Sequence, residues 1–123
     1  MTLGHEAMRT IAFAALVLIA GCARAPSISE AESAAVETEA ASLLSKTDAR
    51  DISSANWPEQ IRNLNPIAVR IRSDGLYVVT SSWFVEEAGL FVPRHPDALS
   101  PVVGSDPEYR RLYGRVFSYR TRG

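Results

Sequence analysis

The chain has 123 residues, a formal net charge of −1 and a hydrophobic content of 46%. A chain of this length forms one domain and not comfortably two, and its near-zero charge gives no basis for a nucleic-acid partner. No cofactor is expected, and no metal either, because no two histidines or cysteines lie at the spacing of metal ligands.

An apolar run of ten residues, from Ile11 to Ala20, stands near the start of the chain. A membrane-spanning helix needs about 17 to 25 apolar residues, so this run is too short to span. A buried core helix would show periodic polar positions, and the run has none. Its length and the preceding Arg9 are typical of a secretory signal, with translation starting at Met1 or at Met8.

Ile19, Ala20, Gly21 and Cys22 follow as an aliphatic residue, two small residues and the only cysteine. They resemble the lipobox of bacterial lipoproteins. The resemblance implies that residues 1–21 are a signal peptide, removed by cleavage before Cys22. It also implies that the Cys22 thiol carries a diacylglycerol thioether and its new amine a further acyl chain such as palmitate. Lipidation also removes an unpaired thiol from an oxidising compartment.

The two residues after the cysteine indicate in which membrane a lipoprotein is retained. Ala23 and Arg24 stand where an aspartate retains lipoproteins at the inner membrane in enteric-type sorting. We therefore expect the cell envelope, at the outer membrane and facing the periplasm, with the inner membrane as the alternative.

The segment 22–51 is expected to be a lipid-anchored tether helix, because it is rich in alanine and glutamate. Ser29 and Glu32 have the spacing of a capping box, which predicts that the helix begins there. An alternative is a helix that docks on a partner. The apolar residues at helical spacing form only a narrow stripe, which would bury little surface area: Val36, Ala40, Leu43 and Leu44.

Residues 52–123 are expected to form a small α+β domain with a three- or four-stranded antiparallel sheet and one or two short helices. Pro58 favours a short helix that ends before Pro66. The alternation from Ile67 to Arg72 predicts a half-buried strand. Ser73-Asp74-Gly75 then predicts a hairpin turn in which Gly75 takes a positive φ, followed by a second strand.

The rest of the domain carries weaker signals. Residues 81–93 are expected to be one extended stretch, interrupted at Gly89 by a turn or bulge. A loop marked by Pro93, Pro96 and Pro101 comes next. A short helical turn is then expected over 107–112, and a closing strand over 115–121. The stretches GLYVVTSSWFVEEAGLFVP and YRRLYGRVFSY resemble small lipoproteins of proteobacteria, which implies no activity and no site residue.

Few residues of the mature chain suggest catalysis. Glu86 and Glu87 are the only adjacent acidic pair in the dense part of the sequence, but neighbours on a strand point to opposite faces. His95 lies between Arg94 and a proline, which favours a surface histidine over a general base. No serine lies in a nucleophile elbow. We therefore expect no catalytic residues and no enzyme.

The last 15 residues contain five arginines and no acid. Of these, Arg115, Arg120 and Arg122 are candidates for binding an acidic partner. The alternative is a strand with Phe117 and Tyr119 buried on one face and a solvated basic face on the other.

Three functions remain open on the sequence. The first is a lipid-anchored envelope protein that acts as a non-catalytic binding or structural module. The second is an inhibitor or immunity-type lipoprotein acting on an envelope hydrolase. The third is a cell-wall glycan enzyme that uses Glu86 or Glu87.

Overall fold

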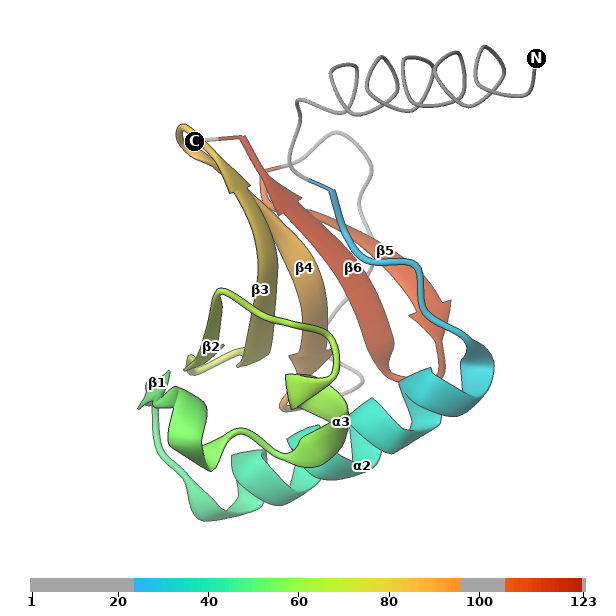
Figure 1. Cartoon of the computed structure of the whole chain (residues 1–123), viewed down its shortest axis with the longest axis vertical. Coiled ribbons are helices and arrows are strands. Elements are labelled where there is room, and N and C mark those ends of the chain that lie inside the picture. The colour runs from blue at the N-terminus through green and yellow to red at the C-terminus, as the bar shows by residue number, and fades with distance from the viewer. Residues whose placement is uncertain (1–23, 96–105, 123) are drawn as a thin grey trace, which may run out of the picture.

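A computed structural model describes residues 24–95 and 106–122, which form a six-stranded antiparallel sheet with helices on one face (Figure 1). The α+β class is confirmed, but the sheet has six strands instead of the expected three or four. The strand order in the sheet is β1-β2-β3-β4-β6-β5. The helices are α2 (Glu30–Lys46) and α3 (Glu59–Arg62), with a 3₁₀ turn at Ser54–Asn56, and the strands are β1 (Arg50–Ile52), β2 (Ala68–Ile71), β3 (Gly75–Trp83), β4 (Glu86–Pro93), β5 (Glu108–Tyr113) and β6 (Val116–Thr121).

The expected signal peptide 1–21, the lipobox with Cys22, and the loop prolines Pro96 and Pro101 lie outside the described residues. Within the described residues, no helix is long and apolar enough to cross a membrane.

The two additional strands come from segments with weak local signals. β1 begins at Arg50, inside the expected tether, and pairs with β2. The helical turn expected over 107–112 is wrong, because residues Glu108–Tyr113 form β5. Pairing of this segment with β6, interrupted only between Arg111 and Tyr113, favours an extended backbone over the local preference for a helical turn.

The backbone at Gly75 and at Gly89 differs in part from what the sequence predicted. Gly75 has a positive φ of +158°, but this is nearly extended and belongs to the first residue of β3. A Cβ there would meet the carbonyl oxygen of Val92, so close approach of the neighbouring strand requires glycine. Gly89 is not a turn, since it lies inside β4 and pairs with Val79, but the expected irregularity is present on the partner strand, where the register shifts between Val79 and Ser81. The chain turns instead at Phe84 and Val85.

The helix α2 is not a free tether, because one of its faces belongs to the hydrophobic core. Its capping box is confirmed, with the Glu32 amide donating to Ser29 Oγ at 3.2 Å. Val36, Ala40 and Leu44 are buried against α3 and the sheet. Small residues on this stripe let the helix approach the sheet closely, so a narrow stripe is sufficient.

Two glutamates of α2 bind backbone amides elsewhere in the fold. Glu39 accepts from the amides of Gln60 at 3.1 Å and Ile61 at 2.9 Å. These are free amides at the start of α3, whose N-cap residue, Pro58, provides no side-chain cap. Glu37 likewise accepts from the amide of Arg115 at 3.0 Å, in the turn before β6. These carboxylates fix α2 to α3 and to the turn between β5 and β6.

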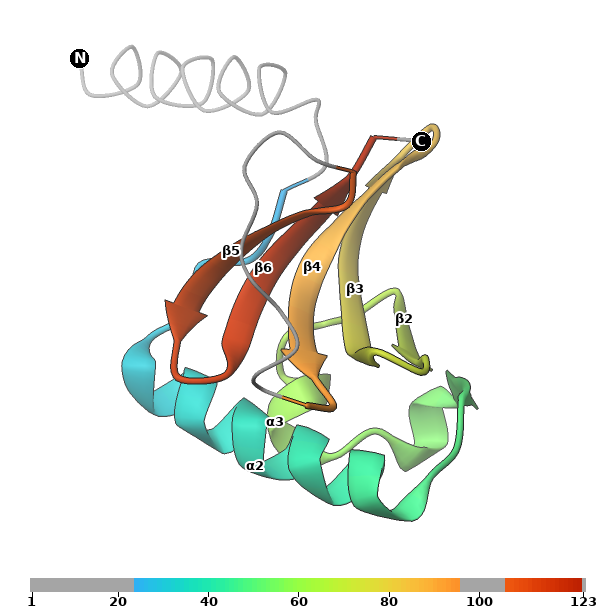
Figure 2. The same cartoon turned by 180° about the vertical axis from the view of Figure 1, so that it is seen from behind.

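The side chains of the sheet form two clusters, one on the face that α2 and α3 cover, here called the helix face, and one on the opposite face, here called the aromatic face. Figure 2 shows the molecule from behind the view of Figure 1. The helix face packs with α2 and α3 in one core, which includes Leu76, Val78, Leu90 and Val116. The aromatic face carries a separate cluster on the other side of the same strands. This cluster consists of Val79, Phe91, Phe117 and Tyr119, with Ala68, Tyr77 and Tyr109 packed against it.

Candidate functional site

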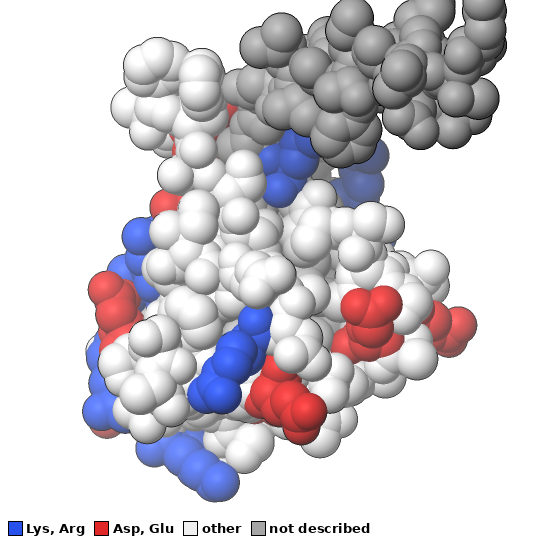
Figure 3. All heavy atoms as spheres, viewed as in Figure 1, with Lys and Arg blue, Asp and Glu red and all other residues white. Residues whose placement is uncertain are grey.

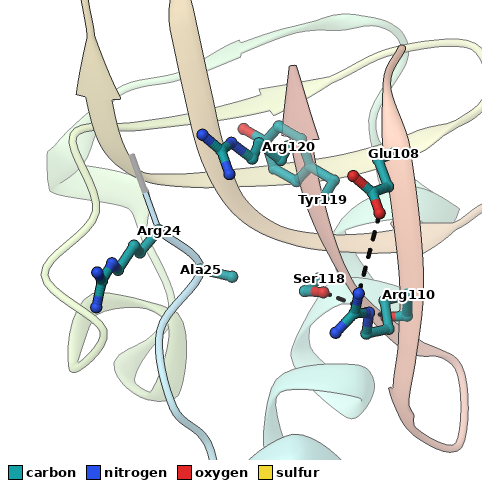
Figure 4. A pocket seen from close by; sticks show the side chains of 7 residues that line it. All are labelled: Arg24, Ala25, Glu108, Arg110, Ser118, Tyr119 and Arg120. Carbon is teal, nitrogen blue, oxygen red and sulfur yellow. Dashed lines mark hydrogen bonds and ion pairs between the residues drawn. The ribbon is translucent and has the colours of Figure 1, made fainter. Parts of the chain in front are cut away.

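A pocket of about 250 Å³ lies between the segment that precedes α2 and the strands β5 and β6 (Figure 4). Pairing of Glu108 with Arg120 and of Arg110 with Ser118 brings these side chains together at the helix face. Arg24 lies across the space from Glu108 and Arg110. We call this the arginine pocket, and its lining is Arg24, Ala25, Glu108, Arg110, Ser118, Tyr119 and Arg120.

Cations outnumber anions in the arginine pocket. Arg120 Nη2 lies 3.2 Å from Glu86 Oε1, and Arg110 Nη2 lies 4.0 Å from Glu108 Oε1. The third guanidinium, that of Arg24, forms no ion pair with another residue that the structure describes. Arg120 Nε is buried and has no hydrogen-bond partner among the described residues. An N–H group in this state lacks the hydrogen bond that buried polar groups ordinarily make.

One face of the molecule shows how charge is distributed there. On the face seen in Figure 3, lysines and arginines are interspersed with aspartates and glutamates, and no large area has a single sign. This face is therefore not a general basic surface.

The three arginines selected from the sequence do not form one surface. Arg120 lines the arginine pocket, and Arg122 Nη2 lies 3.5 Å from Glu108 at the same end of the sheet. Arg115 is at the opposite end of β6, beside α2, with its Nε 4.0 Å from Glu37. Arg120 follows Arg115 by five positions, which is about 17 Å along an extended chain. The structure brings Arg120 together with Arg24 and Arg110, which the sequence did not single out as site residues. Binding of an acidic partner stays a prediction.

A second polar cluster is on the aromatic face. Arg70 Nη1 donates to both oxygens of Glu87, at 2.9 and 2.8 Å, and the Tyr119 hydroxyl donates to the same carboxylate at 3.0 Å. The hydrogen bond to Glu87 raises the pKa of Arg70. Burial raises the pKa of Tyr119, and the negative charge of Glu87 raises it further.

Two more tyrosines extend this cluster. The Tyr77 hydroxyl donates to Asp74 at 2.6 Å and lies 2.7 Å from the Tyr109 hydroxyl. Burial, followed by the hydrogen bond to Asp74, raises the pKa of Tyr77, and burial also raises that of Tyr109. A cavity of about 270 Å³ opens beside the cluster. Alternation in β2 marked Arg70 as a polar position, but only the folded structure shows that its side chain reaches Glu87, two strands away in the sheet.

The adjacent glutamates face opposite sides of the sheet, as expected. Glu86 binds Arg120 on the helix face, whereas Glu87 binds Arg70 and Tyr119 on the aromatic face. Two carboxylates must flank the same bond to cleave a glycoside together, so this pair cannot act in that way. His95 is exposed. Among the described residues, no group of three or more histidines, cysteines or acids could hold a metal ion.

The folded chain is expected to lose stability as the pH rises above about 10, the ordinary pKa of tyrosine. Tyr77, Tyr109 and Tyr119 have raised pKa values, so they keep their protons in the folded state while the unfolded chain loses them. Their stabilisation is thus fully present below pH 10 and declines above it. Urea unfolding as a function of pH measures this decline, and Tyr77→Phe should make it shallower. An equally steep decline in Tyr77→Phe would contradict the assignment.

Comparisons of the chain with protein-family models, curated proteins and solved structures found no match.

Proposed function

We propose that this chain is a lipid-anchored protein of the bacterial cell envelope that binds an acidic group of an envelope partner without catalysis. The anchor is inferred from the order Ile19-Ala20-Gly21-Cys22 directly after a short apolar run. The absence of an aspartate after Cys22 favours the outer membrane, with the folded domain in the periplasm. Two or three acyl chains on Cys22 hold such a protein at a membrane surface stably.

The observation that carries the binding function is the arginine pocket. Three arginines and one carboxylate, that of Glu108, line it, and Arg120 Nε is buried without a hydrogen-bond partner among the described residues. A volume of about 250 Å³ suits a phosphate or carboxylate group rather than a whole drug-sized molecule. The ligand is therefore best described as an acidic group displayed by a larger envelope component.

The polar residues near the pocket favour binding over catalysis. Glu86 is engaged by Arg120 and is separated by the sheet from Glu87. Each carboxylate already has a guanidinium partner, and the two do not meet at one site where they could act together as acid and base.

The test compares two neighbouring arginines of β5 that lie on opposite faces. In Arg110→Gln, the affinity for inorganic phosphate, measured by NMR of the arginine side chains, should fall about 5- to 10-fold, the effect of one charged hydrogen bond. Arg111→Gln is the matched control, because Arg111 lies over the Phe117 ring, with 5.3 Å between its Cζ and the ring centroid. Binding should also weaken as salt is raised. Equal affinity in the two variants, or no binding by the wild type, would refute the proposed function of the pocket.

A further inference from the structure

The turn between β3 and β4 exposes three large apolar side chains. Trp83 is 50% exposed, Phe84 89% and Val85 71%. The rings of Trp83 and Phe84 pack edge to face, with centroids 4.9 Å apart, and so form one apolar tip. We call these three residues the hairpin tip.

The conformation of the hairpin tip is unfavourable for its own sequence. Phe84 has a φ of +54°, in the left-handed region that asparagine and glycine adopt readily and aromatic residues rarely do. Two-residue hairpin turns ordinarily carry asparagine, aspartate or glycine. Here a large ring takes a strained position and gains no burial in the described structure. An aromatic residue in a left-handed turn that gains no packing in return points to a function for the exposed side chains.

The hairpin tip lies at the same end of the sheet as Arg24, the first residue that the structure describes. Figures 1 and 2 show α2 across one end of the strands and the β3–β4 turn at the other, with the C-terminus nearby. The Arg24 amide donates to Ser81 Oγ, two residues before Trp83, at 3.3 Å. Cys22 precedes Arg24 by only two residues, which span at most about 7 Å. A lipid on Cys22 therefore starts near the hairpin tip.

Charges around the hairpin tip favour an anionic surface. Glu86 and Glu87, which follow the tip, are each paired with an arginine, Arg120 and Arg70. Arg24 adds a positive charge without a carboxylate partner among the described residues. The base of the tip thus presents no uncompensated negative charge to lipid headgroups.

We infer that the hairpin tip inserts into the interface of the membrane in which Cys22 is anchored. This inference rests on the anchor of the proposed function. Tryptophan favours the headgroup region, because its ring is apolar while its N–H stays hydrated. Insertion at this point also orients the domain, with the sheet end at the membrane and α2 away from it. The domain would then have a fixed orientation on the membrane when it binds its partner.

The experiment uses the full-length chain with Trp57→Phe, so that Trp83 is the only tryptophan. It is reconstituted in vesicles of phosphatidylethanolamine and phosphatidylglycerol, with or without lipids brominated on their acyl chains. Trp83 emission should shift to shorter wavelength and be quenched by the bromines, and Phe84→Ser should weaken the quenching. The matched control is Trp83→Phe, which leaves Trp57. The Trp57 indole donates to the Ile52 carbonyl at 2.9 Å, within the fold, and should not be quenched.

The same samples separate this inference from the anchor. Palmitate on Cys22 is measured by mass spectrometry. A lipidated chain whose Trp83 stays unquenched overturns the inference and leaves the anchor intact. A quenched Trp83 in a chain without lipid supports insertion and refutes the anchor. Quenching of Trp57 equal to that of Trp83 would also overturn the inference, because it would not be specific to the tip.

Discussion

Gly89→Ala is expected to destabilise the folded chain by about 3 kcal/mol or more, the upper end of the cost of overpacking. Gly89 is buried in β4 and pairs with Val79 of β3 and with Tyr119 of β6. A Cβ at this position would collide with the Val78 carbonyl oxygen and lie 2.9 Å from the carbonyl carbon. These are backbone atoms of the neighbouring strand, so relief requires the central β3–β4 pair to separate. A domain of this size has a total stability of about 5–10 kcal/mol.

Gly114→Ala is the matched control for this substitution. Gly114 has a φ of +54°, but a Cβ there would meet only the Glu37 carboxylate, at 3.4 Å. Its cost should be the left-handed strain alone, about 1 kcal/mol. Urea unfolding followed by circular dichroism compares the two variants. If Gly89→Ala were no more destabilising than Gly114→Ala, the close approach of β3 to β4 would be wrong.

Cys22→Ser is expected to abolish lipid labelling of the chain and to leave its precursor uncleaved. The serine hydroxyl cannot replace the nucleophilic thiol that accepts the diacylglycerol. Loss of the acyl chains removes the main membrane affinity, since each buried CH₂ contributes about 0.8 kcal/mol. Incorporation of labelled palmitate in a diderm host, together with the apparent mass of the chain, measures both effects.

Ala23→Ser serves as the control, because it introduces the same residue beside the cysteine and keeps the thiol. It should label as strongly as the wild type. A wild-type chain without palmitate would refute the lipoprotein interpretation. Continued labelling of Cys22→Ser would instead show that another residue is acylated.

Local signals in the sequence were sufficient for several elements of the fold. Ser29 and Glu32 marked the start of α2, because a capping box involves only residues three apart. Alternating residues predicted β2 and β6, where one side of each strand meets a core. The opposite orientations of Glu86 and Glu87 followed from the alternation of a strand alone.

Tertiary structure decided the role of α2 and the number of strands. The stripe of Val36, Ala40 and Leu44 is too narrow to predict a core helix. The helix is nevertheless part of the core, because apolar side chains of the sheet pack against this stripe. β5 has no clear alternation and takes its extended form from pairing with β6. The turn at Phe84 contains neither glycine nor asparagine, so nothing local marked it.

The composition of the candidate site also depended on tertiary structure. Arg120 was selected from the sequence with Arg115 and Arg122, as the basic face of the expected closing strand. The fold instead places it with Arg110 of β5 and with Arg24, which is nearly a hundred residues away. The physical reason is that antiparallel pairing joins positions by register, while side-chain alternation within one strand reports only which face each residue occupies. A single sequence therefore determines the faces of its strands, and the pairing of those strands determines which charges meet.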